Sequence, residues 1–150
     1  MPSITKFLLI SALSIRRRKA PWWTDQEWTQ VQRVNTEIMP AYYKAKLEAD
    51  ECLTVLGERR NGFQYVILRP GALADGLATG KVQLGHTKGR GEVRRADVAD
   101  MAARLLEVDC RGWFDLLGGD ENVASAVDRV VGEGVNSMEG ENLQEMERNL

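Results

Sequence analysis

The chain has 150 residues, of which 43% are hydrophobic and 28% are charged, and its net charge is −2. These values are typical of one globular domain, and such a charge gives no overall attraction to nucleic acid. No apolar run approaches the roughly 18 residues that a membrane helix needs, so we expect neither a nucleic acid nor a membrane as partner.

Two cysteines and one histidine further restrict the chemistry. Cys52 and Cys110 lie far apart and lack the spacing of metal ligands, which favours reduced thiols and a cytoplasmic protein. With His86 as the only histidine, neither a structural zinc site nor a Ser/His/Asp triad is expected, and the predicted set of metal ligands is empty.

The first predicted elements are a strand and a helix. Residues 4–11 form an apolar run that is too short for a helix, which predicts a parallel strand buried on both faces. Thr24 and Glu27 have the spacing of a capping box, so a helix is expected from about residue 25 to residue 38. The basic run 16–19 between them is interpreted as a solvated loop; a nucleic-acid site is the less favoured alternative.

A second helix is predicted over residues 41–60, with Leu47, Leu53 and Leu56 on its inner face. A strand follows over residues 64–68. The glycine-rich stretch 71–91 indicates a loop with a short extended piece at 81–84.

The remaining predicted elements are an amphipathic helix, a third strand and a last helix, at residues 96–107, 112–117 and 122–131. This alternation predicts an α/β fold with a parallel sheet of about three strands and right-handed crossovers. We expect one domain over residues 1–132 and an acidic, flexible tail over residues 133–150.

Tyr42 and Lys46 are the most informative pair of polar residues. Their i, i+4 spacing places both side chains on one helix face, where an ammonium can hold a phenol ready to exchange a proton. Any amphipathic helix can show this pair by chance, so the spacing alone leaves both interpretations open.

Several motifs together extend this observation. The segment around Tyr42 and Lys46 resembles the active-site helix of the short-chain dehydrogenase/reductase superfamily. The sequences Leu68-Arg-Pro-Gly71, 79–85, 95–99 and 111–117 resemble the second half of an atypical NAD(P)-binding member, of the flavin-reductase-like and NmrA-like type. The resemblance covers most of residues 3–131 and implies a partial Rossmann-like sheet that lacks the N-terminal glycine-rich βαβ half.

The resemblance also implies roles for individual residues. Tyr42 would be the catalytic acid or base, and Lys46 would lower the pKa of the phenol and hold the nicotinamide ribose. Ser11 lies near the usual carbonyl-polarising hydroxyl, although the aligned position itself is Leu13. The favoured alternative for Ser11 is a strand-end hydroxyl that bonds the backbone. Pro70 and Gly71 would pack beside the nicotinamide, or would simply form a turn that ends the strand.

The sequence contains no Gly-x-Gly-x-x-Gly turn to bind the pyrophosphate of NADP or NAD. We therefore expect an NAD(P)-binding oxidoreductase, truncated and weak or inactive alone, that acts on a small carbonyl or flavin-like substrate. The alternative is a catalytically silent regulatory or interaction module. Because the first strand would lack one neighbour, self-association through its exposed edge is also expected.

Overall fold

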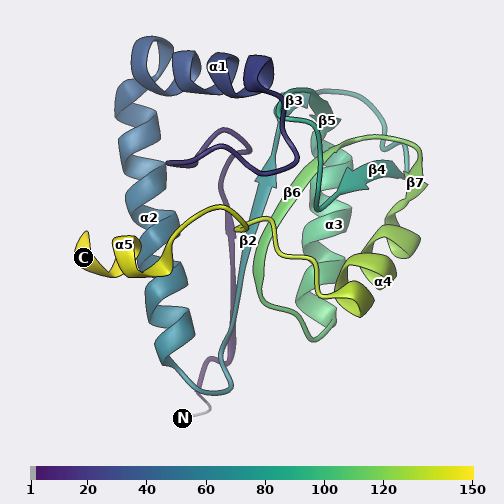
Figure 1. Cartoon of the computed structure of the whole chain (residues 1–150). Helices are drawn as coiled ribbons and strands as arrows, with labels where there is room; N and C mark the ends of the chain where they lie inside the picture. The colour runs from purple at the N-terminus through teal and green to yellow at the C-terminus, as the bar shows by residue number, and fades with distance from the viewer. Residues whose placement is uncertain (1–2) are drawn as a thin grey trace.

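The computed structural model describes residues 3–150, which form an α/β fold around a mostly parallel sheet (Figure 1). The strands in their spatial order are β1 (Lys6–Ile10), β2 (Gln64–Pro70), β6 (Gly112–Gly118), β4 (Lys81–Leu84) and β7 (Glu121–Asn122). The first three are parallel, whereas β4 runs antiparallel to both β6 and β7. A separate parallel pair is formed by β3 (Ala72–Ala74) and β5 (Glu92–Arg94).

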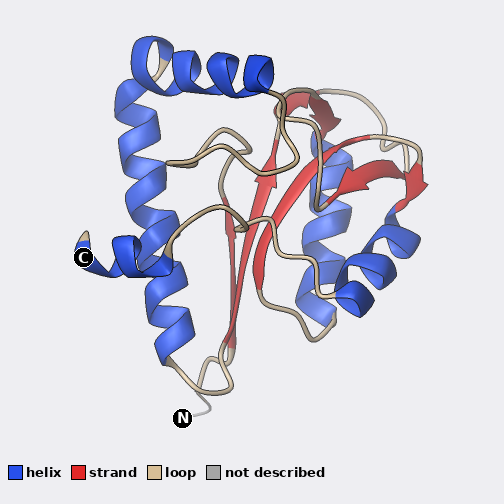
Figure 2. Ribbon diagram, viewed as in Figure 1, coloured by secondary structure: helices blue, strands red, loops and turns tan. Residues whose placement is uncertain are grey.

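Helices cover both faces of the sheet, which confirms the predicted fold class (Figure 2). One face is covered by α2 (Pro40–Arg59) and α5 (Leu143–Arg148), and the other by α3 (Arg95–Glu107) and α4 (Val123–Glu133). At one end of α2 lies α1 (Asp25–Arg33), which continues into a π-helix, η1 (Val34–Ile38). None of the helices within residues 3–150 is long and apolar enough to cross a membrane.

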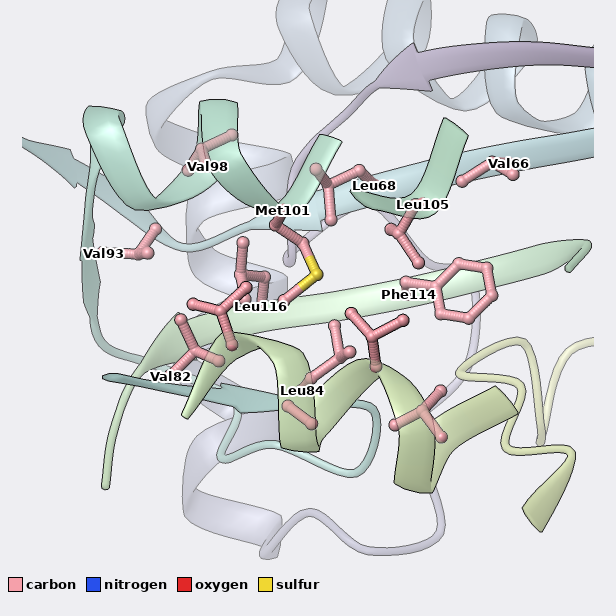
Figure 3. Packing of buried hydrophobic residues seen from close by; sticks show 14 residues of the cluster. Val66, Leu68, Val82, Leu84, Val93, Val98, Met101, Leu105, Phe114 and Leu116 are labelled. Atoms are coloured by element: carbon pink, nitrogen blue, oxygen red, sulfur yellow. The ribbon is translucent and has the colours of Figure 1, made fainter. Parts of the chain in front are cut away.

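The larger apolar core lies between the sheet and the pair α3 and α4 (Figure 3). Val66 and Leu68 of β2 point into it, and Met101 and Leu105 of α3 pack on them. The alternate residues of β2 face α2 instead, where Tyr65 is buried in a second cluster. Both faces of β2 are therefore covered, which explains why its sequence is a continuous apolar run.

The capping box at the start of α1 is confirmed. The Glu27 amide donates to Thr24 Oγ1 at 3.1 Å, and the Thr24 amide donates to the Glu27 carboxylate at 2.8 Å. The helix predicted to continue to residue 38 changes to π geometry at Val34. Within this π segment the buried Asn35 amide donates to the Ser14 carbonyl at 2.6 Å, so the segment is tied to the loop after β1.

Two predictions of burial are wrong. β1 is an edge strand, and Phe7 remains 49% exposed, because only one side of this strand has a neighbour. Leu56, which was expected on the inner face of α2, is 54% exposed, whereas Leu47 is buried. Self-association through the β1 edge stays a prediction.

The segment after α4 packs on the domain, unlike the flexible tail that the sequence suggested. Met146 of α5 is buried beside Tyr65 and Trp113 on the α2 face. The Arg16 guanidinium donates to the carbonyls of Ser137 at 2.6 Å and Glu139 at 2.5 Å. These contacts depend on the folded sheet, so the acidic composition of the segment gave no sign of them.

Candidate cofactor and substrate site

A pocket of about 460 Å³ lies at the carboxyl ends of β1 and β2. This is the edge at which open α/β sheets bind their ligands, and the volume falls in the range of small-molecule sites. Five segments form its walls, namely the loop after β1, the junction of α1 and η1, the start of α2, the end of β2, and the loop before β5.

The pocket brings together three of the five predicted site residues. Tyr42, Pro70 and Gly71 all line it, although they come from two elements far apart in the sequence. Lys46 lies one helical turn from Tyr42 but is outside the lining, and Ser11 is buried behind the wall.

Tyr42 and Lys46 share a helix face, as their spacing predicted. The Lys46 ammonium lies 5.8 Å from the centre of the Tyr42 ring and donates to the Ile10 carbonyl at 3.0 Å. Burial and the nearby charge of Asp50 raise the pKa of Tyr42. The expected lowering of this pKa is therefore not found, and the Lys46 ammonium is instead bonded to a backbone carbonyl of β1.

Ser11 serves a buried carboxylate. Its hydroxyl donates to Asp50 Oδ2 at 2.7 Å, and both side chains are shielded from solvent. This differs from the backbone-bonding interpretation and from a hydroxyl free to polarise a substrate carbonyl. Leu13, at the position aligned with the usual hydroxyl, lines the pocket with an apolar side chain.

A buried charged cluster behind the pocket was missed by the sequence analysis. Arg69 Nε donates to Asp115 Oδ1 at 2.7 Å, and Arg69 Nη1 lies 3.3 Å from Asp50 Oδ2. The same guanidinium donates to the carbonyls of Ile15 at 2.7 Å and Leu13 at 3.0 Å. All three charged side chains are fully buried. Arg69 thus compensates two carboxylates and holds the loop that forms one pocket wall.

Burial makes both carboxylates of this cluster easier to protonate than exposed ones. Burial raises the pKa of Asp50 to about 6, against the opposing effects of Arg69 and Ser11. Burial also raises the pKa of Asp115. One oxygen of each carboxylate has no hydrogen-bond partner among the described residues, and a buried unpartnered carboxylate oxygen is costly when the group is ionised.

A signal for this cluster was present in the sequence. Arg69 and Asp115 each interrupt an otherwise apolar strand, and a charge in a buried strand requires a partner. Their positions are directly paired in the register of β2 and β6. Asp50 carries no comparable signal, because a polar residue on a long helix is usually exposed.

At the end of the pocket, the backbones of Gly71 and Gly91 lie very close to each other. The Ala72 amide donates to the Gly91 carbonyl at 2.9 Å. A Cβ atom on Gly71 would collide with this carbonyl and with Leu117, so only glycine fits there.

The loop over residues 76–81 is held by a carboxylate of the chain itself. Although burial opposes ionisation, hydrogen bonds from Thr79 and Gly80 lower the pKa of Asp97. The Thr79 hydroxyl donates to Asp97 at 2.7 Å, and the Gly80 amide does so at 2.9 Å. Asp97 therefore occupies the amides that a phosphate loop would offer to its ligand.

Residues 2–109 match the model of the NAD(P)H-binding family. The chain therefore belongs to the NAD(P)H-binding family. A sugar epimerase of Bacillus subtilis, YhfK, described as uncharacterized, is 32% identical over 129 residues, which are 85% of this chain and 51% of the relative.

Two solved structures share the fold. The putative NAD-dependent epimerase/dehydratase from Bacillus halodurans has a TM-score of 0.60 at 27% identity, over 82% of this chain and 50% of that one. The oxidoreductase ylbE from Lactococcus lactis has a TM-score of 0.59 at 23% identity, over 84% of this chain and 52% of that one. The chain thus spans about half the length of the relatives it matches.

The residues of the pocket fit the nicotinamide end of such a cofactor. An apolar wall and a glycine-lined end allow a planar ring to approach the backbone closely. The pyrophosphate end is not matched in the same way, because the 150 residues contain no Gly-x-Gly-x-x-Gly turn.

Proposed function

We propose that this chain provides the nicotinamide and substrate side of an NAD(P)H-dependent reductase acting on a small carbonyl or flavin-like substrate. The observation that carries the proposal is the convergence of Tyr42, Pro70 and Gly71 on one pocket at the carboxyl edge of a parallel sheet. The family match supplies the nicotinamide cofactor, which donates a hydride when it is bound.

Tyr42 acts in this proposal as a proton donor. Since its pKa is raised, the phenol keeps its proton at neutral pH, and a protonated phenol can donate to the oxygen of a substrate carbonyl. The Lys46 ammonium lies near the Tyr42 ring. We propose that it leaves the Ile10 carbonyl and hydrogen-bonds the ribose hydroxyls when a cofactor is bound.

We further propose that residues 3–131 correspond to the C-terminal half of a Rossmann-like domain. Two observations support this: the open edge of β1, and the span of about half of each relative. Cofactor binding by these 150 residues alone is then weak, because most charge-assisted bonds to the phosphates come from the glycine-rich half.

Saturation-transfer NMR with NADPH and with NADH tests where the cofactor touches this chain. The nicotinamide protons should receive more saturation than the adenine protons, because the pocket faces only the nicotinamide end. Nicotinamide mononucleotide should compete for the site, whereas adenosine diphosphate should not. Stronger saturation of adenine, or no saturation by a chain that circular dichroism shows to be folded, would contradict the proposal.

Turnover then separates a reductase from a catalytically silent module. In a cofactor-competent form of the protein, Tyr42→Phe should slow carbonyl reduction by about a hundredfold or more, as loss of a general acid does. Tyr43→Phe is the matched control, because the Tyr43 hydroxyl bonds the Arg16 carbonyl at 3.2 Å and does not line the pocket. Equal rates in the two variants would favour the silent module.

A further inference from the structure

The pocket has an apolar lining with a single charged side chain. Leu13, Val31, Val34 and Pro70 contribute hydrocarbon surface. Among the described lining residues, Arg90 is the only one with a charged side chain, and no acidic residue joins it. A ligand that fills this pocket therefore meets hydrocarbon over most of its surface and one cation.

Hydrogen bonds hold the backbone on both sides of Arg90, whereas its side chain has no partner among the described residues. The amide of the preceding Gly89 donates to the Glu27 carboxylate at 3.1 Å, and the following Gly91 accepts from the Ala72 amide. Within residues 3–150 the Arg90 guanidinium makes no ion pair or hydrogen bond, in contrast to Arg69, whose donors bond two carboxylates and two carbonyls. The backbone at Arg90 is thus held in place, and its guanidinium, which also borders a neighbouring pocket lined by Glu92 and Asp120, forms no ion pair among the described residues.

An apolar lip extends the pocket outward. Ile38 and Met39, at the end of the π-helix, line the pocket and are still 60% and 44% exposed. The bond from Asn35 to the Ser14 carbonyl holds this π segment against the opposite wall. Exposed apolar side chains that continue a pocket mark a surface for binding an apolar ligand.

On the basis of the function proposed above, we infer that the substrate is an apolar molecule that carries an anionic group, and that Arg90 binds this group. The apolar body contacts the walls and the lip formed by Ile38 and Met39. The guanidinium fork fits a carboxylate, sulfonate or phosphate, and an unpaired cation next to an apolar wall attracts an anion more strongly than one in bulk water. Arg90 then determines which apolar molecules the pocket accepts.

A pair of dyes that differ only in charge tests this inference on the folded protein without turnover. Anilinonaphthalene sulfonate carries the anionic group, and phenylnaphthylamine has the same rings without it. The wild-type chain should bind the sulfonate more tightly, and Arg90→Gln should weaken that dye about three- to tenfold while leaving the neutral dye unchanged.

Matched variants assign the dye to the pocket. Lys88→Gln removes a cation two residues away that does not line this pocket, and Phe7→Ser removes the exposed ring of β1; neither should change the preference. Ile38→Ser should weaken both dyes equally, because it shortens the apolar lip. Equal binding of the two dyes to the wild type, or an unchanged preference in Arg90→Gln, would overturn the inference.

A further comparison distinguishes a substrate anion from the phosphate of the cofactor. Nicotinamide mononucleotide and nicotinamide riboside differ by one phosphate, so their affinities for wild type and Arg90→Gln report whether Arg90 binds it. An effect of the variant on the mononucleotide but not on the sulfonate dye would assign Arg90 to the cofactor and overturn the inference. Failure of nicotinamide binding with the dye preference intact would instead contradict only the proposed function.

Discussion

The two faces of the sheet are built from the same strands but by different chemistry. Toward α3 and α4, the core is apolar throughout, with Leu68 and Leu116 among its members. Toward α2, the neighbouring residues Arg69 and Asp115 form a buried charged cluster behind the pocket. The comparison indicates that one face supplies stability, whereas the other gives up part of it to fix the geometry of a binding site.

The largest expected effect comes from breaking the charged face. Arg69→Met leaves Asp50 and Asp115 buried without their cation and should lower the free energy of unfolding by about 3–5 kcal/mol. Urea unfolding measures this loss, which should shrink at acid pH because both carboxylates then take up protons. A triple variant that adds Asp50→Asn and Asp115→Asn should recover most of the stability, while the loop over Leu13 and Ile15 loses its anchor. A triple variant as unstable as Arg69→Met would argue against this account.

The apolar face provides the contrast. Leu105→Ala removes a fully buried side chain and should cost about 2–4 kcal/mol, from lost hydrophobic transfer and from the cavity left behind. The same urea experiment should give the same loss at pH 5 and pH 8, because the buried members of the cluster are apolar and burial raises the pKa of the Cys110 thiol packed against them, so that it keeps its proton over this range. Leu106→Ala is the matched control, since Leu106 is half exposed and its loss should be small. A loss of stability in Leu105→Ala that depends on pH would contradict the proposed difference between the two faces.

A smaller expected effect is the change in the free energy of unfolding with pH, which should come from the charged face of the sheet. Because burial raises the pKa of Asp50 from its ordinary value of 3.8 to about 6, the folded chain binds more protons than the unfolded one in this window. Stability should therefore be highest below about pH 4 for this group and should fall as pH rises through 6, by up to about 3 kcal/mol. Asp50→Asn should flatten this part of the profile, and Asp100→Asn, whose half-exposed carboxylate pairs with Arg104 on α3, should not. An unchanged slope in Asp50→Asn would contradict the assignment.

The order of strands and helices was predictable because it rests on local pattern. Apolar runs marked β2 and β6, and Thr24 with Glu27 marked the start of α1. The spacing of Tyr42 and Lys46 placed them on one helix face, which requires only helical geometry. Such features are set by residues close together in the sequence.

The rest of the site depends on contacts between distant segments. Asp50 is buried only because the loop after β1 and the end of β2 close over it, and no local pattern encodes that. The sign of the pKa change at Tyr42 depends equally on tertiary structure, since it follows from burial and from the nearby charge of Asp50. Arg90 was passed over because its significance lies in the apolar walls that surround it.

The segment after α4 has a mechanical consequence. It runs from the α4 side of the sheet to the α2 side, where α5 is seated (Figure 1). Along this path the Arg16 guanidinium donates hydrogen bonds to the carbonyls of Ser137 and Glu139, and Met146 packs beside Trp113. The segment therefore ties the two covered faces of the sheet together, through hydrogen bonds near its middle and apolar packing near its end.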